Sequence, residues 1–404
     1  MATDAFGRLR ISNTYTLFEY YPPNVNSIED INESLDSDTW VTTVNGTSTY
    51  TCNNATVELT CQTNGDKITR ETKLPMEYQP GKSRLFYFSG IPLSRVNSGS
   101  EDIECNIGVF SIDDVTKNPV EGIYLQTDGI YIYFVYCYGG VETKVRQDSW
   151  NIDIFDGDGN SGKTIDINSI IKNILLVIDQ EWLGVGRVRC GFNIEGITYY
   201  GHEFVYSLEY PYTSTPRLPI VYQLSGVTID SSIISKQVCC TCISEGGYTP
   251  IGKKISLLTN NISTGGSNKL IIMGIRIKNL IKTGILKILN FEVIQTGNAI
   301  IEYELQLHSE TNFTYGSVSA PQTFVSKNNS IIEYVEGDGS DYVDSDGFII
   351  SSGLLEKKSS ITLSNNVYET LLVRNQITKY DTLYLVVKAG TNNIRASINL
   401  IESY

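Results

Sequence analysis

Histidine, methionine and tryptophan are scarce in this chain, with two, three and three copies in 404 residues. The two histidines, His202 and His308, stand far apart, and the eight cysteines show no paired C-x-x-C spacing. Because these residues supply most zinc ligands, a zinc site of the usual kind is not expected. The G-x-S-x-G and H-E-x-x-H motifs are also missing, so the sequence predicts no enzyme, no catalytic residues and no cofactor.

Positive charge is also in short supply. Lys and Arg number 31 against 45 Asp and Glu, which gives a net charge of −14 and a sequence pI near 4.7. An acidic surface repels phosphate backbones, and no basic run with interleaved aromatics offsets it, so nucleic acid is not an expected partner. The longest apolar run, residues 130–138, is too short for a membrane-spanning helix. The first four residues do not begin the basic segment and apolar stretch of a secretory signal peptide. We expect neither membrane insertion nor export by that route.

Long stretches with helical periodicity and end caps are missing as well, whereas strand formers punctuated by Gly and Asn are abundant. Residues 301–307 alternate strictly between apolar and polar, as a strand with one wet face does. Segments 123–125, 130–138 and 141–145 predict a three-stranded meander. Its central strand is apolar on both faces, which places it in the middle of a covered sheet. Residues 383–388 and 394–401 predict a C-terminal hairpin.

The length of the chain requires more than one core. The Gly-Gly and Pro of residues 245–250 are typical of a hinge. In segment 4–12, Arg8 and Arg10 lie on one face and Leu9 and Ile11 on the other, which suits either an arm added to a neighbouring sheet or a first edge strand of its own domain. We therefore predict an all-β protein with an N-terminal arm (1–25), a larger β-sandwich or jelly-roll domain (26–245) and a smaller one (246–404).

The stretch GDGNSGKT, residues 157–164, matches the phosphate-binding pattern G-x-x-x-x-G-K-[ST]. A working site of this kind follows a buried parallel strand and opens a helix. Residues 150–156 alternate as a half-exposed strand would, and residues 166–171 are poor or middling helix formers. We interpret the stretch as a surface loop. The alternative, an ATPase, predicts that Lys163→Ala loses nucleotide binding.

Two acidic loops raise the question of calcium. Asp156, Asp158 and Asn160 have the opening spacing of an EF-hand loop, but Ser161 and Ile167 replace its glycine and closing glutamate. Residues 336–346 carry more charge, with Glu336, Asp338, Asp341, Asp344 and Asp346. Calcium binding and ordinary solvated turns both stay open for each loop.

The group Cys239-Cys240-Thr241-Cys242 lies in residues 238–244, which have a strand pattern. We interpret its cysteines as small buried thiols, with a metal or redox role as the less favoured alternative. His202 stands in an aromatic strand context that favours a hydrogen-bonded structural histidine.

Five stretches of the chain stand out together: DAFGRLRIS (4–12), YQPGKS (78–83), DSWN (148–151), EWLGVGRVRCGF (181–192) and ISEGG (243–247). In these stretches the chain resembles a family of virion structural proteins of tailed phages and large DNA viruses. The resemblance covers about the first 250 residues and implies a capsid-associated, tail or fibre component that acts by oligomeric assembly. Its partners would be copies of itself and other virion proteins, and it would be made in the host cytoplasm and reside in the virion. The resemblance also implies that relatives have a Gly-rich loop without the lysine at residues 157–164.

Two other functions remain as alternatives. The 26 tyrosines could provide sugar-stacking platforms, and the Asn- and Tyr-rich loops of residues 246–404 could bind a receptor or a host-surface glycan. A glycan-degrading enzyme would need a pair of carboxylates, which 45 acidic residues do not specify.

Overall fold

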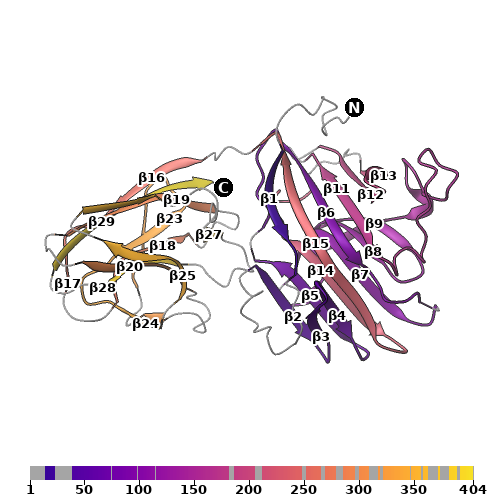
Figure 1. Cartoon of the computed structure of the whole chain (residues 1–404), viewed down its shortest axis with the longest axis horizontal. Helices are drawn as coiled ribbons and strands as arrows, with labels where there is room; N and C mark the ends of the chain where they lie inside the picture. Colours follow the sequence, from indigo (N-terminus) through magenta and orange to yellow (C-terminus); the bar gives the residue numbers. More distant parts are fainter. Residues whose placement is uncertain are drawn as a thin grey trace. The chain divides into compact units, whose positions relative to one another are not determined.

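The computed structural model forms two compact units, residues 1–249 and 250–404, which are described in turn (Figure 1). Both consist of antiparallel sheets, and no α-helix occurs in the described part of the chain, so none there could span a membrane. The all-β prediction is confirmed. The structure describes residues 14–22, 39–73, 75–97, 99–113, 115–181, 186–204, 212–247, 252–264, 269–278, 285–295, 300–308, 317–318, 322–345, 347–355, 358–362, 372–373, 382–388 and 392–403.

The larger unit is a sandwich of two sheets. The eight-stranded sheet runs β13 (Ile197–Phe204), β12 (Val188–Ile194), β11 (Ile174–Gln180), β6 (Ser83–Ile91), β15 (Ile233–Glu245), β4 (Thr56–Cys61) and β3 (Thr49–Asn53), with β1 (Thr14–Tyr20) beside β15. The seven-stranded sheet runs β10 (Val141–Arg146), β9 (Ile132–Tyr138), β8 (Pro119–Thr127), β7 (Asp102–Ile112), β14 (Ile220–Thr228), β5 (Asp66–Thr72) and β2 (Trp40–Asn45).

Alternation along the strands builds the core between these sheets. In β6, Phe86 and Phe88 are buried in it, while Tyr87 and Ser89 lie on the outer face. From the other sheet, Tyr222 of β14 packs edge-on against Phe88 at 6.2 Å. Each such side chain, fully buried, contributes about 1.5–3 kcal/mol to stability.

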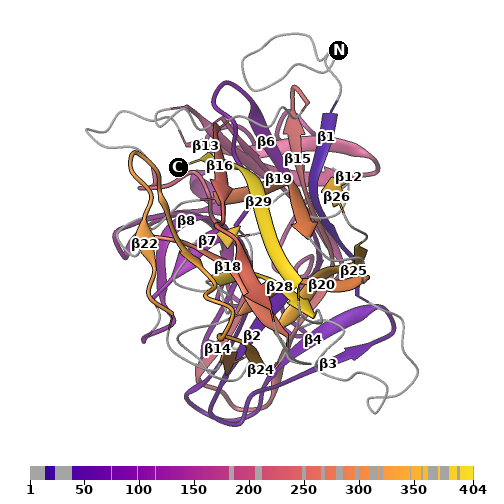
Figure 2. The ribbon, with the colours of Figure 1, turned by 90° about the vertical axis from the view of Figure 1, so that its left-hand side faces the viewer.

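The smaller unit also has two main sheets, around a second core. In one, β29 (Asn392–Ser403), drawn in yellow in Figure 2, lies between β16 (Lys253–Leu258) and β19 (Ile285–Gln295). That sheet also contains β17 (Ile262–Thr264), β26 (Lys358–Thr362) and β27 (Leu372–Val373). The other runs β22 (Val325–Ser326), β23 (Ile332–Glu336), β18 (Leu270–Ile277), β28 (Thr382–Lys388), β20 (Ile301–His308) and β25 (Phe348–Leu355), and β21 (Ser317–Val318) pairs with β24 (Val343–Ser345).

Three predictions about elements can be compared with this topology. The meander is confirmed as β8, β9 and β10, although β9 lies next to the edge strand and not in the middle of its sheet. The C-terminal hairpin is wrong. β28 pairs with β18 and β20, whereas β29 pairs with strands of the facing sheet. Both strands turn apolar side chains into one core, so the chain crosses between layers instead of folding back within one.

The predicted strand at residues 150–156 is also wrong. Apart from one isolated bridge at Asp156, the segment has no strand pairing, and it follows a short 3-10 turn, η2 (Gln147–Ser149). Trp150 and Phe155 are buried in the core, with the Trp150 ring stacked on Phe134 at 4.2 Å. The two aromatics fill part of the core from a loop, while Ile152 between them is 41% exposed, so the apolar positions of this segment do not form one buried face.

The arm motif, residues 4–12, lies outside the described residues. The strand that follows it, β1, pairs with β15 of its own unit from Thr14↔Glu245 to Tyr20↔Cys240. Residues 14–20 thus belong to a sheet of their own unit, whereas both alternatives for residues 4–12 stay predictions.

Candidate functional site

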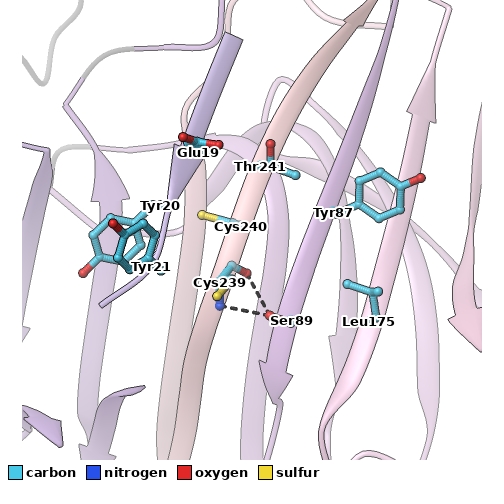
Figure 3. Close-up of a pocket in the computed structure, with 9 residues that line it drawn as sticks. All are labelled: Glu19, Tyr20, Tyr21, Tyr87, Ser89, Leu175, Cys239, Cys240 and Thr241. Atoms are coloured by element: carbon cyan, nitrogen blue, oxygen red, sulfur yellow. Dashed lines mark hydrogen bonds between the residues drawn. The ribbon is translucent and has the colours of Figure 1, made fainter. Parts of the chain in front are cut away.

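A cavity of about 310 Å³ opens on the outer face of the eight-stranded sheet. Four neighbouring strands form it, and Figure 3 shows its side chains standing on β1, β15, β6 and β11. The cavity is lined by Glu19, Tyr20, Tyr21, Tyr87, Ser89, Leu175, Cys239, Cys240 and Thr241.

Strand register explains why these residues meet. Tyr87 is the pairing partner of Thr241, and Thr241 is the partner of Glu19, so one row crosses β6, β15 and β1. A second row joins Leu175, Ser89 and Cys239 across β11, β6 and β15. Side chains in register on one face of a sheet are neighbours, so the two rows form the floor of the cavity.

Some of the polar groups are already engaged within the protein. The Ser89 hydroxyl accepts a hydrogen bond from the Cys239 amide at 2.9 Å and donates to the Cys239 carbonyl at 3.3 Å, as Figure 3 shows. The Thr241 hydroxyl donates to the Phe18 carbonyl at 2.8 Å. These bonds fix the floor in place.

Other polar groups at the cavity are available. Within the described residues, the Glu19 carboxylate and the Tyr21 and Tyr87 hydroxyls make no hydrogen bond, and Tyr21 is 74% exposed. Among the described residues that line the cavity there is no Lys or Arg, and Glu19 is the one charged side chain. The site therefore combines aromatic and apolar surface with a few acceptors and donors, the usual composition of a small-molecule site.

A second polar surface, on the outer face of the seven-stranded sheet, is closed to ligands. Gln126 donates to Asn106, Asn106 to Gln223 and Gln223 to Thr69, which joins four strands. These four side chains are at most 2% exposed. Nearby, Lys144 forms ion pairs with both Glu104 and Glu142, at 3.8 and 2.9 Å. This surface satisfies its own hydrogen bonds and charges.

The loop that resembles a phosphate-binding loop is filled by the protein's own carboxylate. Asp153 is 6% exposed, and its oxygens accept from the amides of Phe155 and Ser161, each at 2.8 Å. A side chain on Gly159 would overlap that carboxylate, and the Lys163 ammonium pairs with Glu195 at 2.6 Å. No helix follows the loop, so the prediction of a surface loop is confirmed.

The two acidic loops do not gather a metal site in the part of the chain that the structure describes, where no group of three His, Cys, Asp or Glu is placed to hold a metal ion. Asp156 accepts from the amide of Asp158 at 2.9 Å, and Asp338 from the amides of Ser340 and Asp341 at 2.7 and 3.2 Å. Asp346 lies outside the described residues. Asp156 and Asp338 thus serve as turn caps.

All eight cysteines are free thiols, and seven are buried. The prediction of buried thiols holds for Cys240 and Cys242 and is wrong for Cys239, which is exposed. Strand alternation is the reason, because Cys240 and Cys242 face the core while Cys239 faces the cavity. Burial raises the pKa of the Cys242 thiol to about 12 and that of Cys240 still higher.

His202 is buried and accepts a hydrogen bond from the Asn151 amide at 3.4 Å, in line with a structural role. Burial lowers its pKa to about 4. His308 lies in the smaller unit, bonded to Gln306 at 2.7 Å, so the two histidines belong to different units.

Three of the motif segments meet at one end of the larger unit. Ser83 donates to Glu245 at 2.7 Å, and Lys82 donates to the Gly247 carbonyl at 3.0 Å. Arg84 directly follows the segment at 78–83, and Gln180 directly precedes the segment at 181–192. The Arg84 guanidinium donates a hydrogen bond to the Gln180 side chain at 2.6 Å. The described residues of these three motifs form a mostly buried polar cluster, and none of them lines the cavity.

Sequence reasoning did not find the cavity. Nothing in the sequence indicates that Glu19 and Tyr20 pair with Thr241 and Cys240, more than 200 positions away. The alternation of the β6 sequence, RLFYFSGI, gives the outward direction of Tyr87 and Ser89 and no more.

No family model and no curated protein matches this chain. Among solved structures, it is similar to an endo-1,3-β-glucanase from Streptomyces sioyaensis, with 8% identity, a TM-score of 0.38, and coverage of 57% of this chain and 96% of that one. The metal-free Emp46p carbohydrate recognition domain has 10% identity, a TM-score of 0.35 and coverage of 57% and 97%. Arcelin-5, a lectin-like defense protein from Phaseolus vulgaris, has 10% identity, a TM-score of 0.34 and coverage of 56% and 97%. At these scores the likenesses carry no argument about function.

Proposed function

We propose that this chain is a non-enzymatic binding protein that recognises a glycan in the cavity on the eight-stranded sheet. The observation that carries the proposal is the set of unpaired polar groups there, the Glu19 carboxylate and the Tyr21 and Tyr87 hydroxyls, beside aromatic and apolar surface. Sugars present apolar C–H faces, which pack on tyrosine rings, and hydroxyls, which donate to a carboxylate.

The size of the cavity limits the size of the ligand that it can hold. Its volume of about 310 Å³ is at the lower end of the range of roughly 300–1,000 Å³ for small-molecule sites. One sugar residue, such as the end of a glycan chain, suits that volume. None of the described lining residues is cationic, which favours a neutral sugar over a phosphorylated one.

The lining favours binding over hydrolysis. Glycoside cleavage ordinarily uses two carboxylates on either side of the bond, and Glu19 is the one acidic side chain among the described residues that line the cavity. Glu104 and Glu142 lie on the other sheet, where both are ion-paired with Lys144. Among its described residues, the cavity therefore lacks the second carboxylate that the enzyme alternative requires.

The resemblance of the first 250 residues to virion structural proteins supports a place for the protein in a virus particle. We propose a component of the particle surface, capsid-associated or in a tail or fibre, in which assembly and glycan recognition are properties of the same chain. The sequence resemblance is the support for this setting, and the cavity is the support for the glycan.

Binding is tested on the full chain with a glycan array, followed by titration of the strongest binder. Tyr87→Ala removes one aromatic wall and is expected to weaken binding about tenfold, which corresponds to roughly 1.4 kcal/mol. Tyr138→Ala is the matched control, because Tyr138 is 36% exposed on the other sheet, away from the cavity. An array without any binder, or equal affinities for the two variants, contradicts the proposal.

A further inference from the structure

Strand β1 forms one side of the cavity and is weakly held by burial. It supplies Glu19 and Tyr20, and Tyr21 follows it directly. Within the described residues β1 pairs with β15 alone, and none of its seven residues is fully buried. Strands with so little apolar burial are the ones that open first in a folded protein.

One buried arginine compensates for this lack of burial. Arg70 of β5, in the facing sheet, is 1% exposed. Its Nη2 donates to the Tyr20 hydroxyl at 2.9 Å, its Nε to Gln237 at 2.7 Å and its Nη1 to Thr42 at 3.1 Å. The guanidinium thus joins β1 to β15, β2 and β5 in the middle of the core.

Aromatic contacts complete the anchor. The Arg70 guanidinium lies over the Trp40 ring at 4.7 Å, and the Tyr20 ring meets Trp40 edge-on at 5.1 Å. A charged group inside a core is costly unless it is hydrogen-bonded, so the bond to Tyr20 matters to the whole arrangement. If β1 left β15, Arg70 would lose a partner and the cavity would lose a wall.

We propose that Arg70 is a positioning residue of the glycan cavity. Through Tyr20 it holds β1 against β15, and ligand occupancy and β1 docking form one coupled equilibrium. The coupling rests on the proposed glycan function, because a ligand that needs Glu19 and Tyr21 binds only the docked state and stabilises it. The anchor itself does not depend on any ligand.

Two cysteines offer a direct readout of β1 docking. Tyr20 is the pairing partner of Cys240, and Phe18 is the partner of Cys242. Cys240 lines the cavity but is 3% exposed. Release of β1 uncovers this edge of β15, so the alkylation rate of Cys240 reports the undocked population.

The test compares Tyr20→Phe with Tyr133→Phe. Both variants lose one hydroxyl hydrogen bond, since Tyr133 donates to Asp128 at 3.2 Å on the seven-stranded sheet. Alkylation of Cys240 by iodoacetamide, followed by peptide mass spectrometry, is expected to be about tenfold faster in Tyr20→Phe, the equivalent of roughly 1.4 kcal/mol. Hydrogen exchange is expected to rise at residues 14–20 and 240–245 and to stay unchanged in β7 and β8.

If Cys240 is alkylated at the same rate in Tyr20→Phe as in the unchanged protein, Arg70 does not anchor β1 through Tyr20. The anchor is also overturned if Tyr133→Phe speeds Cys240 alkylation equally, or if Tyr20→Phe raises hydrogen exchange in every strand. The methyl glycoside of the array's strongest binder is then added to the unchanged protein, where it is expected to slow Cys240 alkylation. No slowing despite binding overturns the coupling alone. An empty array removes the proposed function and the coupling, while the alkylation result still decides the anchor.

Discussion

Single buried polar residues fix the turns of the larger unit, and Asp66 is the clearest case. It is 1% exposed and accepts from the amides of Thr47, Gln62 and Thr63 at 2.7, 2.7 and 2.9 Å. Gly46 adopts a φ of +72°, and a side chain there would overlap the Asp66 carboxylate. Burial by itself raises the pKa of Asp66, but the hydrogen bonds from Thr63, Gln62 and Thr47 outweigh it and lower the pKa to about 2.

Stability is therefore expected to depend on the ionisation of Asp66. Because the pKa of Asp66 is lower in the folded state than its ordinary value of 3.8, its contribution is present above about pH 4 and is lost as the pH falls toward 2. Asp66→Asn, which keeps the shape but loses the charge, is expected to lower the free energy of unfolding near neutral pH by about 1–3 kcal/mol. Urea denaturation at several pH values measures both effects.

Asp113→Asn is the control for this prediction. Asp113 also accepts from two turn amides, those of Val115 and Thr116, but in an exposed loop where water replaces the lost bonds. A smaller loss of stability is expected there. Equal losses in the two variants, or an unchanged acid dependence in Asp66→Asn, would show that the buried carboxylate has no special role.

At the scale of elements, the loop at residues 157–164 shows how a motif can be occupied from within. Its glycines and amides surround Asp153 in the way that a phosphate-binding loop surrounds an anion. The sequence pattern describes the loop's own residues, whereas the occupant lies four positions before the loop begins. A pattern match therefore needs its flanks as well.

Two substitutions separate the structural from the nucleotide interpretation of this loop. Asp153→Ala leaves the buried amides of Phe155 and Ser161 without an acceptor and is expected to lower the free energy of unfolding by about 1–3 kcal/mol. Lys163→Ala breaks an exposed ion pair with Glu195 and a distant cation–π contact with Tyr199 at 6.0 Å, and is expected to change stability little. Titration calorimetry with Mg-ATP is expected to show no heat for either variant or for the unchanged protein. Nucleotide binding that disappears in Lys163→Ala would restore the ATPase alternative.

The elements also show which parts of the fold a sequence can reveal. Strict alternation located β20 correctly, and glycine turns located the meander of β8 to β10. Alternation states which side chains share a face, but not which strand lies alongside, and so β28 and β29 were paired wrongly. The cavity was missed for the same reason, since Glu19, Thr241 and Tyr87 become neighbours only through long-range pairing.

At the scale of the whole molecule, each unit has its own core and the chain as a whole is strongly acidic. The length of the chain predicted more than one core, and its abundance of strand formers predicted an all-β fold, because these properties depend on sums over the chain. Assembly into an oligomer depends on particular surfaces of the protein, which length and composition do not describe. A net charge of −14 makes copies of the chain repel one another unless a specific contact overcomes the repulsion.

The segment before β1 is the part of the sequence best suited to make that contact. Arg8 and Arg10 bring positive charge into an acidic chain, so the segment is attracted to the surface of a second copy. We expect the full chain to form a closed oligomer, seen by light scattering as a multiple of 45.0 kDa, and the chain without residues 1–12 to stay a single copy. Arg8→Glu combined with Arg10→Glu keeps the length and is expected to act like the deletion, with the unchanged oligomer weakening as salt rises. A full chain that is already a single copy at high concentration would contradict assembly through this segment, and the glycan cavity would then stand as the function of a monomer.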